Sequence, residues 1–200
     1  MDHATLSDVG DARRRATYDD LVAVPEHLVA EIIDGELITS PRPAPPHALA
    51  ASAIGSVLFD RFNGGSGGAA NPGGWWILSE PELHLGDDVL VPDIAGWRRE
   101  RMARLPSEAY FTIPPDWVCE VVSPSSGRLD RTRKMPIYAR VGVQHLWLVE
   151  PPARTLEVYR LAGGRWTVEI TLAASEPVAI PPFEATTIDM RRWWTDEPAL

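Results

Sequence analysis

Cysteine and lysine are nearly absent from this sequence of 200 residues. Cys119 is the one cysteine, which excludes an internal disulfide, and its apolar neighbours predict a buried core thiol in a reducing compartment. Of the 19 basic residues, Lys134 is the one lysine, so arginine supplies the rest of the positive charge. Arginine keeps its proton in proteins and cannot act as a base, whereas lysine can. Position 134 is therefore singled out before any motif is considered.

Long apolar runs and several enzyme motifs are also missing. No stretch approaches the roughly 18 apolar residues of a membrane span, and residues 1–15 lack the apolar core of a signal peptide. The glycine-rich stretch 64–74 lacks the Gly-Lys-Ser/Thr ending of a phosphate-binding loop, so we expect a flexible connection there. Ser123 stands outside a Gly-x-Ser-x-Gly elbow and is not expected to be a nucleophile. These absences favour a soluble, cytoplasmic protein without a membrane partner.

The formal net charge of -9 argues against tight coating of nucleic acid, because backbone affinity comes from basic side chains that neutralise phosphates. A local basic groove is still compatible with this balance, so we expect DNA binding that is weak or transient. Arginines gather in two short stretches, for which solvated helix surfaces are the alternative interpretation. These residues are Arg98, Arg99, Arg101 and Arg104, followed by Arg128, Arg131 and Arg133.

Two short apolar stretches each contain one acid. Asp93 lies in VPDIAGW, residues 91–97, and Glu120 lies in WVCEVV, residues 117–122. Both stretches have the composition of buried strands. Burying an unpaired carboxylate costs several kcal/mol, so each acid should be paired, bound to metal or exposed in a cleft.

These two acids and the lysine suit metal-assisted hydrolysis of a phosphodiester. Carboxylates of Asp93 and Glu120, with the backbone carbonyl of Val121, can hold Mg²⁺ or Mn²⁺ and leave several positions for water and phosphate. Lys134 can orient or deprotonate the attacking water and offset the charge that develops on the phosphate. The alternative for Lys134 is a surface ion pair with Asp130, four residues earlier.

The sequence resembles the Uma-two family of restriction-type endonucleases, a branch of the PD-(D/E)xK nuclease superfamily. The stretches that carry the resemblance are AEIIDGELITSPRPAPPHA (30–48), VPDIAGW (91–97), PDWVCEVVSPSS (115–126) and KMPIYARVGVQHLWLVEPPARTLEVYR (134–160). The resemblance implies a metal-dependent nuclease core in which Asp93 and Glu120 are ligands. The superfamily places its lysine two residues after the second acid, where this chain has Val122. The resemblance therefore implies that Lys134, from the following helix, takes that role.

Further site candidates come from the segments around these residues. The 28–39 stretch carries two acids, Glu31 and Glu36, either of which could face the metal; we take Glu36 as the catalytic candidate and the solvent face as the alternative for both. Glu82 is a spare candidate ligand. Three residues are candidate substrate contacts, with capping or surface roles as the alternatives: His47, Ser123 and Arg131.

The order of elements predicts an α/β (mixed α+β) fold with a restriction-endonuclease-like core, a mixed sheet flanked by helices and added hairpins. We expect one domain over 16–200 after a disordered segment 1–15. We also expect a homodimer, because a nuclease that cuts both strands often uses two sites and because the C-terminal tryptophans need cover, either from the core or from a second subunit. Asp34-Gly35 predicts a hairpin. The predicted helices span 17–24 and 47–63, with one near Lys134 that Pro136 kinks or delays, and the predicted strands span 28–39 as a hairpin, then 75–79, 81–85, 89–97, 117–122, 144–150, 155–161 and 165–172.

Three functions are compatible with this sequence. The first is a metal-dependent DNA endonuclease, whose cleavage would vanish in Asp93→Ala or Glu120→Ala. The second is a nuclease-like domain that binds nucleic acid or protein without turnover. The third is a metal enzyme acting on a small phosphorylated compound, which would turn over that compound and leave DNA intact.

Overall fold

The computed structural model describes residues 14–64, 68, 71–173 and 176–195. Residues 1–13 of the segment predicted to be disordered, and residues 65–67 and 69–70 of the predicted flexible connection, lie outside the described residues. The helices are α1 (Tyr18–Val22), α2 (Pro45–Leu58), η1 (Phe59–Asn63), α3 (Gly127–Leu129), η2 (Asp130–Lys134), α4 (Met135–Arg140) and η3 (Met190–Trp193). The strands are β1 (Leu28–Ile33), β2 (Glu36–Pro41), β3 (Trp75–Ser79), β4 (Leu83–Leu85), β5 (Asp88–Leu90), β6 (Ile94–Arg98), β7 (Trp117–Val121), β8 (His145–Glu150), β9 (Thr155–Ala162), β10 (Arg165–Ala173), β11 (Val178–Ala179) and β12 (Thr187–Ile188).

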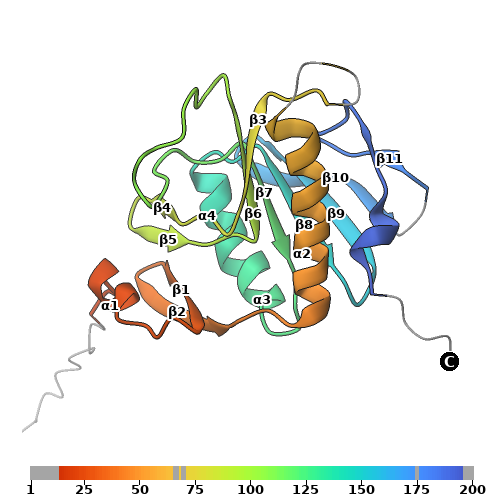
Figure 1. The fold of residues 1–200 in the computed structure, drawn as a ribbon. Coiled ribbons are helices and arrows are strands. Elements are labelled where there is room, and N and C mark those ends of the chain that lie inside the picture. Colours follow the sequence, from red (N-terminus) through yellow and green to blue (C-terminus); the bar gives the residue numbers. More distant parts are fainter. Residues whose placement is uncertain (1–13, 65–67, 69–70, 174–175, 196–200) are drawn as a thin grey trace, which may run out of the picture.

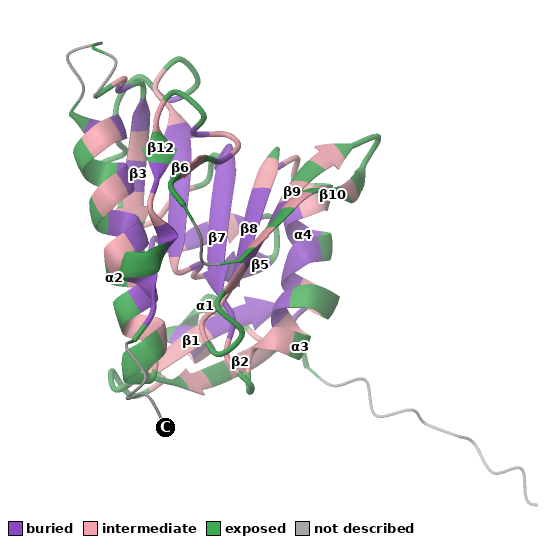
Figure 2. Cartoon of the chain, turned by 90° about the vertical axis from the view of Figure 1, so that its right-hand side faces the viewer, coloured by how far each residue is buried: buried purple, intermediate pink, exposed green. Residues whose placement is uncertain are grey.

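A six-stranded mixed sheet in the order β10-β9-β8-β7-β6-β3 forms the centre of the fold (Figure 1). Strands β7 and β8 pair in parallel, and the other neighbours pair antiparallel. A parallel pair needs a crossover connection, which the segment α3–η2–α4 provides. In Figure 2, α2 covers one face of this sheet and α4 the other. The predicted mixed α/β architecture is confirmed.

Side chains of β7 divide the interior into two apolar clusters, because successive residues of a strand point to opposite faces. Trp117, Cys119 and Val121 pack on the α2 side, together with the C-terminal segment. Val118 and Val122 pack on the α4 side. Glu120, between these two valines in the alternation, therefore shares the α4 face with an apolar core.

The second sheet, in the order β2-β1-β5-β4, begins with the predicted hairpin. Asp34 and Gly35 both have positive φ, 53° and 82°, which is the backbone of a tight two-residue hairpin turn. Strands β1 and β5 are joined through one residue pair, Ile32 with Val89. The predicted strand 89–97 is wrong as one element: it divides into β5 and β6 because Pro92 lies in between and has no N–H to donate.

The helical crossover between β7 and β8 contains an unusual turn. Its middle section, Asp130–Lys134, is a π-helical turn, and Pro136 follows as a residue of the first turn of α4. Proline has no N–H to donate into the preceding turn, and the hydrogen bonding changes from π- to α-helical just before it, at Met135. The crossover is thus helical on both sides of Lys134, and both Lys134 and Tyr138 are buried.

Side chains from neighbouring segments cover the free edge of strand β3. Both the N–H and the carbonyl of Ile77 are hydrogen-bonded by the side chain of Asn63, from η1. Arg99 donates to the carbonyl of Trp75, 3.1 Å away. These contacts occupy backbone groups that would otherwise pair with another strand.

The C-terminal tryptophans are covered by the chain itself. Trp193 and Trp194 are 1% and 7% exposed and belong to the cluster on the α2 side of the sheet. Their cover, for which a second subunit was one option, is therefore internal, and the homodimer stays a prediction. No helix in the described part of the chain is long and apolar enough to cross a membrane.

Candidate active site

Strand register brings the two predicted acids together. Strands β6 and β7 pair antiparallel with Ile94 opposite Cys119. Continuing this register by one residue places Asp93 opposite Glu120, and opposite residues of an antiparallel pair point to the same face. Asp93 Oδ2 accepts a hydrogen bond of 2.7 Å from the N–H of Val121, which ties the end of β7 to Asp93. Residues 27 positions apart in sequence thus form one site at a strand end.

Lys134 lies between two glutamates. Its Nζ is 2.8 Å from Oε1 of Glu120 and 3.1 Å from Oε1 of Glu31, which comes from β1. The same oxygen of Glu31 accepts a 2.8 Å bond from the N–H of Val91, in the connection from β5 to β6. Asp130, one π-turn before, is 4.0 Å from the ammonium. Lys134 is therefore a buried member of a charge cluster and not part of a surface ion pair.

Tyr138 completes the environment of Glu120. Its hydroxyl donates to Oε1 of Glu120 over 2.6 Å, so two donors of the same crossover, Lys134 and Tyr138, meet on one carboxylate oxygen. A buried phenol needs such a partner, because its hydroxyl has left water. Burial, followed by the nearby Glu120 carboxylate, raises the pKa of Tyr138 well above its ordinary value, so the phenol remains a donor.

Asp93 and His47 form the more accessible end of the site. Nε2 of His47, in the first turn of α2, is 2.6 Å from Oδ1 of Asp93. Their side chains are 15% and 17% exposed, whereas those of Lys134 and Glu120 are each 4% exposed. The site is thus reached from the Asp93 side, and Lys134 closes its inner end.

The charges of the cluster do not balance. Burial raises the pKa of Glu120 well above its ordinary value, and the Lys134 ammonium opposes this only in part. Burial also raises the pKa of Asp130, whose Oδ2 is buried without a hydrogen-bond partner among the described residues. Glu31 and Asp93 add to the negative potential at both groups. Ionising all four carboxyl groups around one ammonium would leave an excess of negative charge, which a further cation would offset.

Lys134 keeps its proton in this environment. Burial disfavours the ammonium, but the carboxylates of Glu120 and Glu31 outweigh that cost and raise the pKa of Lys134 well above its ordinary value. A lysine of raised pKa is a poor general base near neutral pH. Of the two roles expected for Lys134, orientation and charge stabilisation fit the geometry, and proton abstraction does not.

The donor set suits a hard divalent cation. Carboxylate oxygens of Asp93 and Glu120 and the carbonyl of Val121 are the ligand type that Mg²⁺ takes, and Mg²⁺ commonly keeps several waters beside few protein ligands. A bound cation is also favoured by the negative charge of the cluster and by Oδ2 of Asp130, which is buried without a hydrogen-bond partner among the described residues. Over the part of the chain that is described, however, no three His, Cys, Asp or Glu side chains are already arranged around one point as a metal shell.

Comparison with known proteins gives the family. The sequence profile of the Uma2 (Uma-two) family, described as putative restriction endonuclease, matches residues 16–191. The chain belongs to the Uma2 family. The sequence search against curated proteins found no match.

The fold of this Uma2 protein has a solved counterpart. It is similar to the crystal structure of a putative nuclease belonging to DUF820 from Anabaena variabilis, with a TM-score of 0.68 and 24% identity, covering 89% of this chain and 97% of that chain. The restriction-endonuclease-like fold predicted from the sequence is therefore confirmed. Membership of the Uma2 family points to a nuclease of the restriction-endonuclease type.

The choice of Glu36 as the acid from the hairpin needs correction, since the Uma2 chain places Glu31 beside Lys134 instead. Glu36 is exposed and pairs with Arg133 over 2.6 Å. Both acids project from the same face of the hairpin, because Glu36 is the cross-strand partner of Ile33, two residues from Glu31. Glu36 lies at the turn, where Arg133 pairs with it, and Glu31 lies further along the strand, where Val91 and Lys134 reach its carboxylate.

The remaining candidates lie around the site and not in it. Ser123 closes the loop after β7 by exchanging hydrogen bonds with Ser126. Arg131 points toward β8 and β9, where it pairs with Glu157 at 3.3 Å. Glu82 is bonded to Tyr18 and His84 and does not reach the cluster. No substrate role follows from these contacts, and those roles stay predictions.

The arginine stretches serve mainly as structural contacts. Arg98 and Arg99 stack on the rings of Trp75 and Trp76, and Arg101 pairs with the buried carboxylate of Asp116. Arg133 binds the β1–β2 turn. These contacts reduce the number of arginines that are free to form a basic groove.

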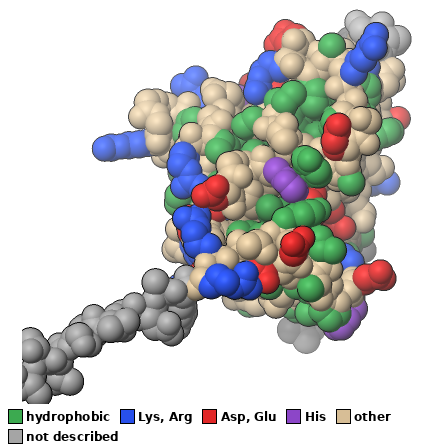
Figure 3. Space-filling model, turned by 90° about the vertical axis from the view of Figure 1, so that its left-hand side faces the viewer, with side chains coloured by type: hydrophobic (Ala, Val, Ile, Leu, Met, Phe, Trp, Pro, Cys, Tyr) green, Lys and Arg blue, Asp and Glu red, His purple; other side chains and the backbone are tan. Residues whose placement is uncertain are grey.

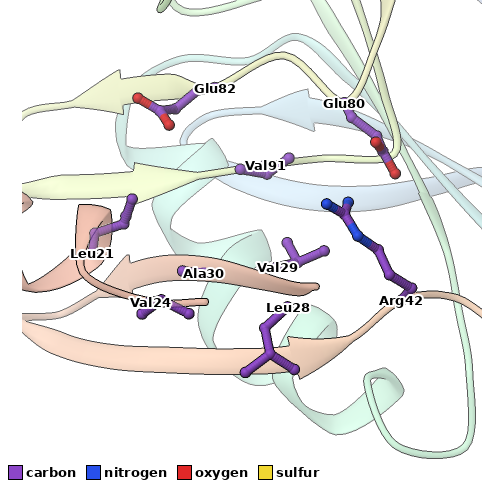
Figure 4. Close-up of a pocket in the computed structure, with 9 residues that line it drawn as sticks. All are labelled: Leu21, Val24, Leu28, Val29, Ala30, Arg42, Glu80, Glu82 and Val91. Atoms are coloured by element: carbon purple, nitrogen blue, oxygen red, sulfur yellow. The ribbon is translucent and has the colours of Figure 1, made fainter. Parts of the chain in front are cut away.

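A cleft of about 260 Å³ is lined by residues of β1 and of the β5–β6 connection (Figure 4). Val91, which donates to Glu31 on the site side, also lines this cleft. Figure 4 shows Arg42 reaching from the segment after β2 toward Glu80, with apolar side chains of β1 below. The cleft is lined by Leu21, Val24, Leu28, Val29, Ala30, Arg42, Glu80, Glu82 and Val91.

Sequence reasoning missed Tyr138 and underrated Asp130. Tyr138 stands four residues after Lys134, a spacing that places two side chains on one helix face. That spacing could have found it. The burial of Asp130 depends on how the crossover docks against the sheet, which local sequence does not reveal.

Proposed function

We propose that this chain is a metal-dependent endonuclease that hydrolyses phosphodiester bonds of DNA. The observation that carries the proposal is the position of Lys134, whose ammonium lies 2.8 Å from Glu120, on the face where the strand register also places Asp93. Two acids and a lysine are the residue types that metal-assisted hydrolysis of a phosphodiester uses, which supports the proposal. Membership of the Uma2 family supports the same reaction class.

Asp93, Glu120 and the carbonyl of Val121 would hold Mg²⁺ or Mn²⁺. When bound, the cation would offset phosphate charge and lower the pKa of a bound water. His47 holds Asp93, and Tyr138 and Lys134 hold Glu120, so both ligand carboxylates are fixed by neighbouring side chains.

Lys134 acts as a protonated group in this proposal. Its ammonium orients the attacking water by hydrogen bonding and stabilises the negative charge that grows on the phosphate oxygens in the transition state. The site is largely buried, which strengthens that electrostatic effect relative to water. Glu31 holds the ammonium from the side opposite Glu120.

The DNA strand would approach the site from the Asp93 side and run along the cleft that Val91 lines. Arg42 is the basic residue among the nine that line this cleft and can donate to a backbone phosphate. Glu80 and Glu82 line the same cleft, which limits its affinity for a polyanion. On the face of the molecule drawn in Figure 3, basic and acidic side chains are interspersed with apolar ones, as suits weak or transient binding.

A nicking assay on supercoiled plasmid DNA tests the function. The wild type should nick in the presence of Mg²⁺ or Mn²⁺, and Asp93→Asn and Glu120→Gln should lower the rate by at least about 100-fold. Glu157→Gln, an acid outside the cluster, is the matched control and should keep the wild-type rate. Nicking that survives both site substitutions would exclude this site as the catalytic one.

A second candidate function is a nuclease-like domain that binds nucleic acid or protein without turnover, and two observations favour it. The described residues contain no preformed metal shell, and the ammonium of Lys134 already neutralises part of the acid cluster. DNA binding without nicking under any divalent cation would support that function in place of the first.

A further inference from the structure

The contacts of Glu120 with Tyr138 and Lys134 both fall on one of its two carboxylate oxygens. Lys134 at 2.8 Å and the hydroxyl of Tyr138 at 2.6 Å both contact Oε1. The Tyr138 hydroxyl donates a hydrogen bond to Oε1 and the Lys134 ammonium is ion-paired with the same oxygen, so both side chains hold Glu120 through one oxygen. The oxygen left for a further ligand is Oε2.

The two donors come from one rigid element. Lys134 ends the π-helical turn and Tyr138 lies four residues later in α4. The ring of Tyr138 is fully buried in the apolar cluster on that side of the sheet, so the position of its hydroxyl is set by packing. The Lys134 ammonium is shared between Glu120 and Glu31, whereas the Tyr138 hydroxyl contacts Glu120 alone.

We propose that Tyr138 is a positioning residue of the nuclease site, which holds Oε1 of Glu120 and thereby directs Oε2 toward the cation. This inference rests on the proposed function. The phenol does not touch substrate or metal; it acts through Glu120. Partners of this kind typically change metal affinity by about 10–100-fold when they are removed.

Tyr138→Phe tests this role because it removes the hydroxyl and keeps the ring that fills the core. Calorimetric titration of Mn²⁺ into the metal-free variant should give an affinity about 10–100-fold weaker than that of the wild type. The matched control is Tyr159→Phe, which removes a hydroxyl that donates to Glu157 over 2.9 Å, away from the cluster. That variant should bind Mn²⁺ within about two-fold of the wild type.

The nicking kinetics should likewise show a defect in Tyr138→Phe and none in Tyr159→Phe. For Tyr138→Phe, plasmid nicking should recover as the Mn²⁺ concentration is raised, since the defect lies in holding the ligand. A purely structural role would lower the thermal unfolding temperature of Tyr138→Phe and leave the Mn²⁺ affinity unchanged, and that result would overturn the inference while the endonuclease proposal stands. A wild type that binds no Mn²⁺ would overturn both.

Discussion

Lys134 is surrounded by more carboxylate than one ammonium neutralises, and this imbalance affects stability as well as chemistry. Glu31, Glu120 and Asp130 all lie within 4.0 Å of its Nζ. Charge in excess at a functional site is a common cost of function. In the metal-free protein the ionised forms of Glu120 and Asp130, the two acids whose pKa is raised, are destabilised.

The raised pKa of Glu120 predicts a pH-dependent stability. Burial makes the folded protein keep a proton on Glu120, and on Asp130, to higher pH than the unfolded chain does. Above their ordinary pKa values of 4.5 and 3.8 the unfolded chain therefore binds fewer protons, and the free energy of unfolding falls as pH rises. Lys134 adds no slope there, because its pKa lies above that range in both states.

Urea unfolding between about pH 5 and pH 8 measures this slope. Glu120→Gln should show a smaller fall in the free energy of unfolding than the wild type, because residue 120 no longer titrates. Parallel curves for the two proteins would contradict the assignment of a raised pKa to Glu120. His145, whose pKa is lowered by burial, contributes equally to both curves.

For individual residues, the sequence indicated the candidate site residues more clearly than the side chains that surround them. Asp93, Glu120 and Lys134 could be found because acids in apolar strands and a single lysine stand out. Glu31 could not be told from Glu36 by strand parity, since the hairpin register puts both on one face. Only the approach of Val91 and Lys134 to Glu31 distinguishes them.

Among the elements, η1 protects the edge of the central sheet. Asn63 is buried and bonds both backbone groups of Ile77. Asn63→Ala would leave that N–H and carbonyl without partners, and each buried unpaired group costs about 1–3 kcal/mol. Thermal or urea unfolding should show a loss of at least about 1 kcal/mol, whereas Asn71→Ala, at an exposed asparagine, should be neutral. Equal stability of the two variants would show that water replaces the Asn63 contacts.

Most elements could be predicted, because hydrophobic period and turn residues are local signals. The Asp34-Gly35 hairpin is confirmed, and the helix predicted from residue 17 begins with a capping box of Thr17 and Asp20. The π-helical turn at 130–134 could not be predicted, since it depends on docking Lys134 among acids of other strands. The division of 89–97 into two strands followed from Pro92, which was visible in the sequence.

For the whole molecule, the net charge of -9 makes DNA affinity depend on few basic contacts. If Arg42 contacts a phosphate, Arg42→Ala should reduce the slope of log affinity against log salt by about 0.9 on duplex DNA or about 0.7 on single strands. Fluorescence anisotropy of a labelled oligonucleotide measures this slope. Arg165→Ala, at the exposed β9–β10 turn, should leave it unchanged. An unchanged slope in Arg42→Ala would remove the cleft from the substrate path.

The central claim is that Asp93 and Glu120 together hold a catalytic cation beside Lys134. Calorimetric titration of Mg²⁺ or Mn²⁺ into the wild type and into Glu120→Gln, with plasmid nicking assayed on the same samples, tests it most directly. The account predicts saturable binding and nicking in the wild type, both lost in Glu120→Gln. A wild type that binds neither cation would contradict the account and leave this fold as a binding module.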